Sequence, residues 1–423
     1  EADLFLRLGQ RQTGLLVERG EGWFGFFHPT FKEYLAARAC VLEGQMKGVA
    51  GTWKVLQPHL DDALWHEVIL LTVGYKAIIE SQDEAAAYLV RRIAAEPDEH
   101  GDNVVLAGRC LADIGHGLVP DACWDEVVQK LIPVMQDTAP DGHPNHPPVV
   151  PIPTRYAAAE TLDRLRWLPP DLDAFVEIPN PQSQSPIYVA RYPVTNHQFS
   201  RFVDAGGYEN PVYWGGEESD AWRWRLTEHN VEWRGEAPVT QPEYWDHSRY
   251  GKNRRGYPVV GVSWYEANAY CAWLTEKLQV TGYGFQVWRD GKLETWNLEP
   301  GTLTVRLPTE KEWEAAAGGA GEDRYPWGPN WDEGCANSSR RTGERGIDGI
   351  TTPVAMYPAG RSEPYGVWDM GGNLWEWTAP GVEKVELEAC ALCSASWYDF
   401  QDSARVSARR WEHPDHSGTD IGF

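Results

Sequence analysis

One twelve-residue stretch constrains the fold of this 423-residue chain more than any other. Residues 367–378 read Val-Trp-Asp-Met-Gly-Gly-Asn-Leu-Trp-Glu-Trp-Thr, so two glycines and three tryptophans share one short bend. Glycines allow backbone turns that side chains forbid, and the indole rings supply large, rigid apolar surfaces. We therefore expect a tight turn at Gly371 and Gly372 inside an aromatic core.

The polar residues of this bend allow two interpretations. Asn373 and Glu376 offer oxygen atoms of the kind that calcium prefers. Alternatively, the bend is an ordinary buried turn in which the Glu376 carboxylate accepts hydrogen bonds from backbone amides. The sequence alone leaves both interpretations open.

Several further motifs accompany the bend in a defined order. They are Tyr192-Pro193-Val194-Thr195-Asn196, Pro258-Val259-Val260-Gly261-Val262-Ser263-Trp264, Arg306-Leu307-Pro308-Thr309-Glu310, Tyr325-Pro326-Trp327-Gly328 and Ile421-Gly422-Phe423. With the bend they cover about residues 180–423 and resemble the formylglycine-generating-enzyme (sulfatase-modifying factor) family. The resemblance implies a variant of the C-type lectin fold, in a chain of α+β class whose N-terminal domain is mostly helical.

The resemblance also implies structural calcium. Asn337, Ser338, Asp348 and Ile350 match in spacing the segment that holds one calcium ion in the family, and Asn373 and Glu376 match part of a second site. Oxygen side chains and backbone carbonyls are suitable calcium ligands. For Asn337 and Asp348, an ordinary solvated loop remains the alternative.

The enzymes of this family oxidise a substrate cysteine with a copper-binding pair of cysteines that follows a Gly-Gly-Ser-Trp/Tyr segment. Here that segment reads Cys393-Ser394-Ala395-Ser396-Trp397, and no cysteine follows it. Cys390 and Cys393 lie before Trp397 and do not match the copper pair. Because such chemistry needs a thiolate at a defined place, we expect no copper and no enzymatic activity.

The segment after Trp397 resembles the variable region of proteins diversified by retroelements, which use the same fold and also end near Ile-Gly-Phe. In that system template adenines are randomised, so that asparagine codons become codons for Tyr, Asp, Phe, His, Ser or Thr. The resemblance implies ten ligand-binding positions, called here the terminal surface: Tyr398, Asp399, Phe400, Trp411, Glu412, His413, His416, Ser417, Thr419 and Asp420. The fixed frame between them is Arg405, Ser407, Ala408, Arg409, Ile421 and Gly422.

Two alternatives to a binding surface remain. These residues also suit an ordinary surface loop, and His413 and His416 with Glu412 or Asp415 suit a metal site, although Pro414 prevents a regular helix from presenting both histidines. A mixture of aromatic and short polar side chains is, however, what a paratope needs. We therefore favour a non-enzymatic protein that binds an unknown ligand, which we expect to be a protein.

Composition restricts the partners and the compartment. The net charge of −24 argues against nucleic acid and against an anionic membrane, since both require basic surface. No apolar run reaches the roughly 18 residues of a membrane span. Seven scattered cysteines suit the reducing cytoplasm, where we place the protein. Because the chain begins at Glu1 rather than methionine, we expect a fragment or a processed form.

The N-terminal region carries a second resemblance. A helix started by Pro29, with Phe31, Tyr34 and Leu35 on one face, resembles the stretch that follows the nucleotide-binding core of NACHT-type signalling NTPases. No Gly-x-x-x-x-Gly-Lys-Ser/Thr loop occurs, so we expect no nucleotide. A signalling adaptor associated with such an NTPase is therefore a third functional hypothesis, beside the binding protein and the cysteine oxidase.

The pattern predicts four parts. They are a mostly helical region at residues 1–136, a proline-rich linker at 137–154, a connecting helix at 155–179 and the lectin-like domain at 180–423, with its variable region at about 397–423. Helical runs are expected near 104–114, 124–135 and 156–165. Capping boxes are expected at Ser81 with Glu84, Thr195 with Gln198, Ser263 with Glu266, and Thr309 with Glu312.

Overall fold

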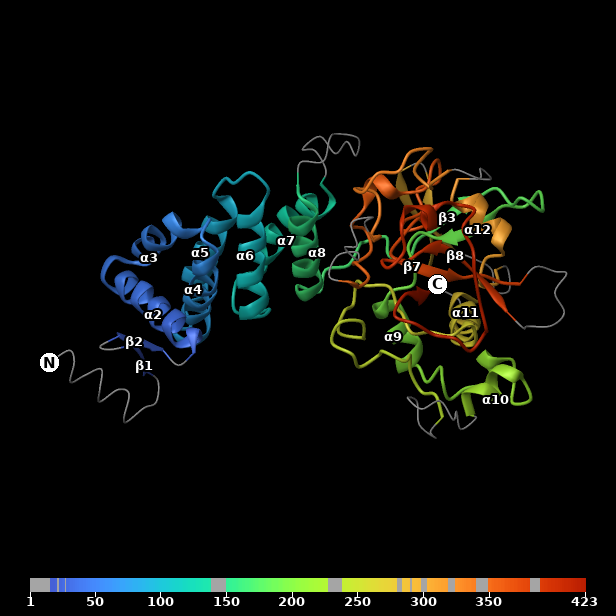
Figure 1. The fold of residues 1–423 in the computed structure, drawn as a ribbon, viewed down its shortest axis with the longest axis horizontal. Coiled ribbons are helices and arrows are strands. Elements are labelled where there is room, and N and C mark those ends of the chain that lie inside the picture. Colours follow the sequence, from blue (N-terminus) through green and yellow to red (C-terminus); the bar gives the residue numbers. More distant parts are fainter. Residues whose placement is uncertain are drawn as a thin grey trace. The chain divides into compact units, whose positions relative to one another are not determined.

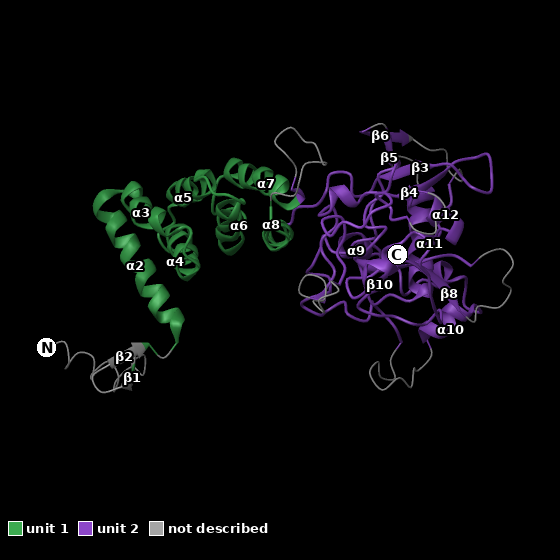
Figure 2. Ribbon diagram, turned by 45° about the horizontal axis from the view of Figure 1, so that its top comes forward, with its two compact units in different colours: residues 1–135, 149–165 green, residues 136–148, 166–423 purple. Residues whose placement is uncertain are grey.

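The computed structural model describes residues 16–20, 23–26, 28–137, 150–226, 238–279, 284–289, 291–297, 303–318, 324–339, 349–380 and 389–423. The chain divides into two compact units, which Figure 2 colours separately. Unit 1 contains residues 1–135 and 149–165, and unit 2 contains residues 136–148 and 166–423.

The described residues of unit 1 form helices and one hairpin. Its elements are β1 (Leu16–Gly20), β2 (Trp23–Phe26), α2 (Pro29–Lys47), α3 (Val49–Leu56), η1 (Gln57–His59), α4 (Ala63–Gly74), the π-helical turn η2 (Tyr75–Ile79), α5 (Asp83–Ala95), α6 (Asp102–Ile114), α7 (Asp121–Gln136) and α8 (Ile152–Arg164). The predicted start at Pro29 is confirmed, since His28 caps the helix by accepting a hydrogen bond from the Thr30 amide.

Helix α2 buries one side and exposes the other. Its buried residues Ala37, Cys40, Val41 and Gly44 face the bundle. Phe31, Tyr34 and Leu35, the predicted apolar face, are instead 40%, 42% and 52% exposed, and Met46 is 82% exposed. The apolar face of this helix therefore remains uncovered among the described residues.

Two predictions for unit 1 are wrong in detail. Ser81 has a left-handed φ of 50° and does not cap α5, which begins at Asp83 with Gln82 at the N-cap. Asp83 and Glu84 instead stabilise the first turn through the helix dipole. The connecting helix predicted at 155–179 is shorter, because α8 ends at Arg164 and β3 has formed by Phe175. Most of the predicted proline-rich linker, residues 138–149, lies outside the described residues.

Unit 2 contains two four-stranded sheets with helices beside them (Figure 1). One sheet has the order β4-β3-β5-β6, formed by β3 (Phe175–Ile178), β4 (Ile187–Ala190), β5 (Gly284–Arg289) and β6 (Lys292–Asn297). The other has the order β10-β7-β8-β9, formed by β7 (Leu374–Trp377), β8 (Cys390–Ala395), β9 (Arg410–Glu412) and β10 (Ile421–Gly422). The helical elements are α9 (Asn196–Asp204), η3 (Pro211–Trp214), α10 (Asp220–Leu226), α11 (Trp264–Gln279), α12 (Glu310–Ala316), η5 (Pro358–Gly360) and η6 (Gln401–Ala404).

The second sheet holds the end of the chain. Strand β10 pairs in parallel with β7, while β8 pairs antiparallel with both β7 and β9. The Phe423 carbonyl then accepts a hydrogen bond of 2.8 Å from the Val194 amide. Residues 421–423, which follow the terminal surface, are therefore fixed by backbone hydrogen bonds to β7 and to Val194.

Three predicted capping boxes of unit 2 are confirmed. In α9 the Thr195 hydroxyl accepts from the Gln198 amide, and the Gln198 side chain accepts from the Thr195 amide. Reciprocal bonds of the same kind start α11 at Ser263 and α12 at Thr309. These starts are local, so the sequence specifies them directly.

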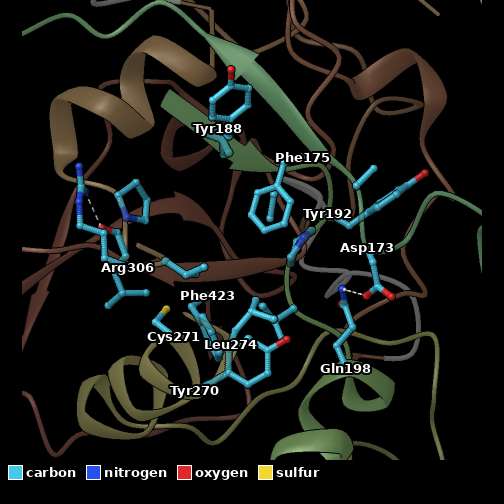
Figure 3. Close-up of a pocket in the computed structure, with 18 of the residues that line it drawn as sticks. Asp173, Phe175, Tyr188, Tyr192, Gln198, Tyr270, Cys271, Leu274, Arg306 and Phe423 are labelled. Atoms are coloured by element: carbon cyan, nitrogen blue, oxygen red, sulfur yellow. Dashed lines mark hydrogen bonds between the residues drawn. The ribbon is translucent and has the colours of Figure 1, made fainter. Parts of the chain in front are cut away.

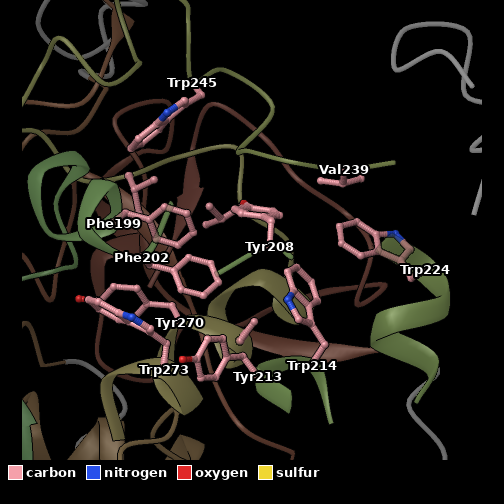
Figure 4. Packing of buried hydrophobic residues seen from close by; sticks show 13 residues of the cluster. Phe199, Phe202, Tyr208, Tyr213, Trp214, Trp224, Val239, Trp245, Tyr270 and Trp273 are labelled. Atoms are coloured by element: carbon pink, nitrogen blue, oxygen red, sulfur yellow. The ribbon is translucent and has the colours of Figure 1, made fainter. Parts of the chain in front are cut away.

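An aromatic core joins α9 and α11 (Figure 4). The Phe199 ring stacks on Tyr270 at 5.5 Å between centroids, and Phe202 meets Trp273 edge-to-face at 5.9 Å. Gly207 is required beside them, since an added Cβ would lie 2.1 Å from the Phe202 ring. This packing holds α9 and α11 against each other.

Candidate functional site

The terminal surface contains three large exposed aromatic side chains. Tyr398 is 52% exposed, Phe400 is 49% exposed and Trp411 is 45% exposed. Trp411 lies on β9, the edge strand of its sheet, opposite Ala391 of β8. We call Tyr398, Phe400 and Trp411 the exposed aromatic trio.

Buried side chains hold the backbone that carries this trio. Trp397 is 7% exposed, and its indole N–H donates to the Thr419 carbonyl at 3.3 Å. Ala404, Val406 and Ile421 are almost completely buried. The segment therefore alternates between outward side chains and inward anchors, although Ala404 and Val406 were not among the predicted frame residues.

Trp375 of β7 is a second anchor, and the sequence analysis did not identify this role. Its backbone N–H donates to the Asp420 carbonyl, and its indole N–H donates to Oδ2 of Asp399, both at 2.8 Å. One buried residue thus holds both ends of the terminal surface. A tryptophan on β7, within the tryptophan-rich bend, was the available signal.

Asp399 differs from the other predicted ligand-binding positions. Its Oδ2 also accepts hydrogen bonds from the amide and the hydroxyl of Ser396, at 3.0 and 2.5 Å. The side chain points inward because it caps the turn after β8. Asp399 is therefore part of the frame, in contrast to the outward position that we predicted for it.

Arg410 organises two further acidic positions. Its guanidinium donates to Glu412 at 2.9 Å and to Asp420 at 2.8 Å, and both carboxylates are half-buried. Arg410 and Glu412 are two residues apart on β9, so they lie on one face of the strand and Trp411 lies on the other. The ion pairs leave Glu412 and Asp420 at the edge of the surface with a fixed geometry.

The loop between β9 and β10 is tied down by its backbone. The Pro414 carbonyl accepts from the Trp264 amide at 3.0 Å, and the Gly418 carbonyl accepts from the Gly261 amide at 2.9 Å. The Ser417 hydroxyl donates to Glu243. His413 is exposed and Nδ1 lies 2.5 Å from Asp415, while His416 is half-buried.

The histidines of this loop do not form a recognisable metal site. Within the described ranges, no three histidine, cysteine or carboxylate side chains are grouped in a way that would hold a metal ion. The alternative of a site at His413 and His416 therefore receives no support from the geometry.

The glycine bend differs from its prediction in one respect. Asp369 and Asn373, with φ of 58° and 76°, take the left-handed conformation, while Gly371 and Gly372 do not. The glycines are needed for close packing, since a Cβ would lie 2.6 Å from Trp327 at Gly371 and 2.9 Å from the Asn337 carbonyl at Gly372. Asp369 and Asn373, rather than the glycines, therefore have the strained backbone conformation.

Asn373 is already satisfied by the protein. Its Oδ1 accepts from the Thr352 amide at 2.8 Å and from Asn337 Nδ2 at 3.2 Å, and its Nδ2 donates to the Thr352 carbonyl at 3.1 Å. This side chain cross-links two loops. Because its amide oxygen and nitrogen already have hydrogen-bond partners, the Asn373 side chain is not a suitable calcium ligand in this conformation.

Glu376 has a different neighbour, Asp369. Burial, with a smaller effect of Asp369, raises the pKa of Glu376 to about 8, despite a hydrogen bond from the Trp313 indole. Burial also raises the pKa of Asp369 to about 7, and Asp369 Oδ2 has no hydrogen-bond partner among the described residues. Trp313, rather than backbone amides, is the partner of Glu376.

The Asp369 carboxyl has an orphaned oxygen and interacts electrostatically with the half-buried Glu376 carboxyl, so the two groups suit a bound cation, which would favour their ionised forms. The carboxyl pair, Asp369 and Glu376, thus suits the calcium that the sequence resemblance implies, with Asp369 in place of Asn373. Calcium would supply positive charge and cross-link the bend to β7.

The first predicted calcium segment is only partly described. Asn337 Nδ2 donates to the Ile350 carbonyl at 2.9 Å, so these two predicted ligands lie together, and Ser338 follows Asn337 directly. Asp348 lies outside the described residues. Calcium at this segment stays a prediction.

The cysteines give no sign of a reactive pair. Cys390 and Cys393 are buried thiols that form no disulfide among the described residues, and burial raises the pKa of the Cys393 thiol. They are three residues apart on β8, so they face opposite sides and pack in different apolar clusters. They are side chains of the core.

The fold and these motifs define an α+β domain of the formylglycine-generating-enzyme-like, C-type lectin type, preceded by a mostly helical unit. Residues 176–423 match the sulfatase-modifying factor enzyme 1-like domain. The chain therefore belongs to this family, as its motifs predicted.

Relatives in this family differ in activity. Inactive C-alpha-formylglycine-generating enzyme 2 of Bos taurus is 30% identical over 259 residues, which are 56% of this chain and 76% of that protein. Formylglycine-generating enzyme of Thermomonospora curvata is 29% identical over 288 residues, which cover 56% of this chain and 81% of that protein. Family membership thus leaves the activity of this chain open.

A solved structure is similar to part of the chain. Treponema denticola variable protein 1 is 20% identical, with a TM-score of 0.32, over 59% of this chain and 89% of that chain.

No helix in the described part of our chain is both long and apolar enough to span a membrane.

Proposed function

We propose that this protein binds a ligand, which is itself a protein, through the terminal surface. One observation carries the proposal. Among the described residues of unit 2, every exposed Phe, Tyr or Trp side chain belongs to the exposed aromatic trio, Tyr398, Phe400 and Trp411. Large exposed apolar side chains that gather in one segment mark interaction sites, and Tyr and Trp are enriched at binding hot spots.

The surrounding frame supports a surface whose side chains vary. Trp397, Trp375 and Ile421 hold the backbone from the inside, so the outward side chains are not needed for packing. Random changes in volume and charge are tolerated at such positions and are excluded from a close-packed core. We therefore propose that a retroelement diversifies the outward positions, with Asp399 left out of the predicted set.

We also propose that the protein is not an enzyme. The chain has no cysteine after Trp397, and Cys393 is buried with a raised pKa, which is the opposite of what a nucleophilic thiolate needs. We propose calcium as a structural ion, the cytoplasm as the location, and no contact with nucleic acid or membrane, in keeping with the net charge of −24.

A display experiment tests the proposed surface. One library of the full chain randomises Tyr398, Phe400, Trp411, His413 and His416, and a control library randomises Trp397, Ala404, Val406 and Ile421. We expect the first library to remain folded on phage and to yield saturable binders of a chosen target such as lysozyme. The control library should lose folded display. Equal loss of fold in both libraries, or no enrichment from the first, would contradict the proposal.

The exposed face of α2 favours a second function. Phe31, Leu35 and Met46 are exposed apolar side chains on unit 1, and uncovered apolar faces of this kind bind partner proteins. Unit 1 is then an adaptor that contacts a NACHT-type NTPase. A photo-cross-linking residue at Leu35 should label such an NTPase in cells, while one at exposed Glu67 should not. Equal labelling from both positions would argue against the adaptor.

A further inference from the structure

Unit 2 contains a cavity of about 340 Å³ between the sheet β4-β3-β5-β6 and helix α11 (Figure 3). This volume lies within the range of small-molecule binding sites. The cavity lies apart from the terminal surface, since none of the ten predicted positions lines it. It is therefore a separate feature of the domain.

The lining is mostly apolar and comes from many elements. Phe175 belongs to β3, Leu274 to α11 and Phe423 to the end of the chain, and Val194 and Val305 lie on loops. All five side chains are only half-buried, although each packs against an apolar cluster of the domain. Because all five side chains line the cavity, part of their apolar surface borders it and is not covered by the protein itself.

The charged groups at two ends of the cavity are already paired. At one end Arg306 makes two hydrogen bonds of 2.7 Å to Glu312. At the other end Asp173 accepts from Arg201 at 2.8 Å and from Gln198 at 3.1 Å. A charged ligand would have to break one of these pairs or remain unpaired in an apolar space, and both are costly.

Two further titratable groups, Glu376 and Cys271, belong to the lining, beside neutral polar side chains such as Gln286 and Thr304. Glu376 borders the cavity beside Trp313 and belongs to the carboxyl pair described above. The Cys271 thiol lies on the wall formed by α11, and burial raises its pKa to about 12, so it remains an uncharged wall atom. The Glu376 carboxyl accepts a hydrogen bond from the Trp313 indole, and Cys271 offers no charge to a ligand in the apolar middle of the cavity.

From this geometry we propose that the cavity binds an uncharged, largely apolar small molecule with a ring system. The aromatic side chains Phe175, Phe285, Tyr270 and Phe423 around the space favour planar rings. Exposed Pro186 and half-buried Tyr188 lie on the β4 side of the lining, so this side is in contact with solvent. This edge of the sheet is therefore one route by which a ligand can enter.

The site also contacts the end of the chain. Phe423 lines the cavity, its ring packs on Tyr270 at 5.4 Å, and its carbonyl is bonded to Val194. A ligand in the cavity therefore adds contacts to the residue that follows β10. Ligand binding stabilises unit 2 because it favours the folded state.

Two fluorescent probes test the proposal on the full chain. N-phenyl-1-naphthylamine is uncharged, and 1-anilinonaphthalene-8-sulfonate has the same rings with a negative charge. We expect saturable, one-site binding of the uncharged probe, at least tenfold tighter than binding of the sulfonate, and a higher Tm of the chain in its presence. No saturable binding of the uncharged probe, or equal affinity for both probes, would overturn the proposal.

Filling the cavity locates the binding site. Leu274→Trp places a larger side chain into the space, and Leu293→Trp on β6, where Leu293 is 38% exposed and outside the lining, is the matched control. Val305→Phe is a second filling variant from another element. We expect each filling variant to bind the uncharged probe at least tenfold more weakly at an unchanged or higher Tm, while the control binds as the original chain does.

Other results would contradict the assignment. If at least one filling variant is folded and still binds the probe with unchanged affinity, the probe is not in the cavity. If both filling variants unfold the domain, the cavity has no room for the larger side chains and therefore none for a ligand. The triple variant Tyr398→Ser, Phe400→Ser and Trp411→Ser separates this site from the terminal surface: it should retain probe binding, and loss of binding would place the probe on the exposed aromatic trio.

Discussion

Two tryptophans of the terminal segment offer a matched comparison of frame and surface. Trp397 is 7% exposed and donates a hydrogen bond to the Thr419 carbonyl, whereas Trp411 is 45% exposed on the edge strand β9. Trp397→Ala removes a buried ring and leaves a cavity, at a cost of roughly 3–5 kcal/mol in the free energy of unfolding. Trp411→Ala removes a ring that is half in water, so its cost should stay near about 0.5–1 kcal/mol.

Urea unfolding of the full chain measures both costs. Near-ultraviolet circular dichroism reports the tryptophan environments, most of which lie in unit 2, and the midpoint of each variant is compared with that of the original chain at an equal slope. A cost for Trp411→Ala as large as for Trp397→Ala, or a cost below about 1 kcal/mol for Trp397→Ala, would refute the division into frame and surface. Ligand binding should show the opposite order, with Trp411→Ala as the damaging change.

Three further outcomes are expected. Trp375→Phe keeps most of the ring but removes the 2.8 Å bond to Asp399, so it should cost about 1–2 kcal/mol in urea unfolding; a cost under about 0.3 kcal/mol would show that the anchor is unimportant. In EGTA, the raised pKa values of Asp369 (about 7) and Glu376 (about 8) mean that the folded chain keeps protons which the unfolded chain loses, so stability should fall as pH rises from about 4 to about 8. Calcium should remove this fall in Tm, and identical pH profiles with calcium and with EGTA would argue against the ion. With copper and a sulfatase-type cysteine peptide, mass spectrometry should detect no aldehyde, and copper-dependent turnover would reverse our functional assignment.

The sequence predicted best what is local or what resembles the family. The capping boxes at Thr195, Ser263 and Thr309 involve residues only three apart, so the pattern alone specifies them. The family resemblance predicted the fold class, which the match of residues 176–423 confirms. Outward and inward positions around Trp397 followed from side-chain type and from the same resemblance.

The sequence-based predictions were wrong where contacts between residues distant in the sequence determine the structure. Ser81 and Glu84 have the correct spacing for a capping box, but the π-helical turn before them gives Ser81 a left-handed backbone instead. The outward prediction for Asp399 failed because its partner, the indole of Trp375, is 24 residues away in sequence. The cavity had no signal in the sequence, since its lining comes from many separate elements.

The central claim is that the outward residues after Trp397 vary while the inward ones do not. Deep sequencing of this locus in a growing population tests it directly, in parallel with a search for a neighbouring reverse transcriptase and a repeat that differs at adenines. We predict substitutions concentrated at the codons of Tyr398, Phe400, Trp411 and His413, with Trp397 unchanged. Substitutions spread evenly over the segment, or a locus without variation and without a reverse transcriptase, would contradict the account.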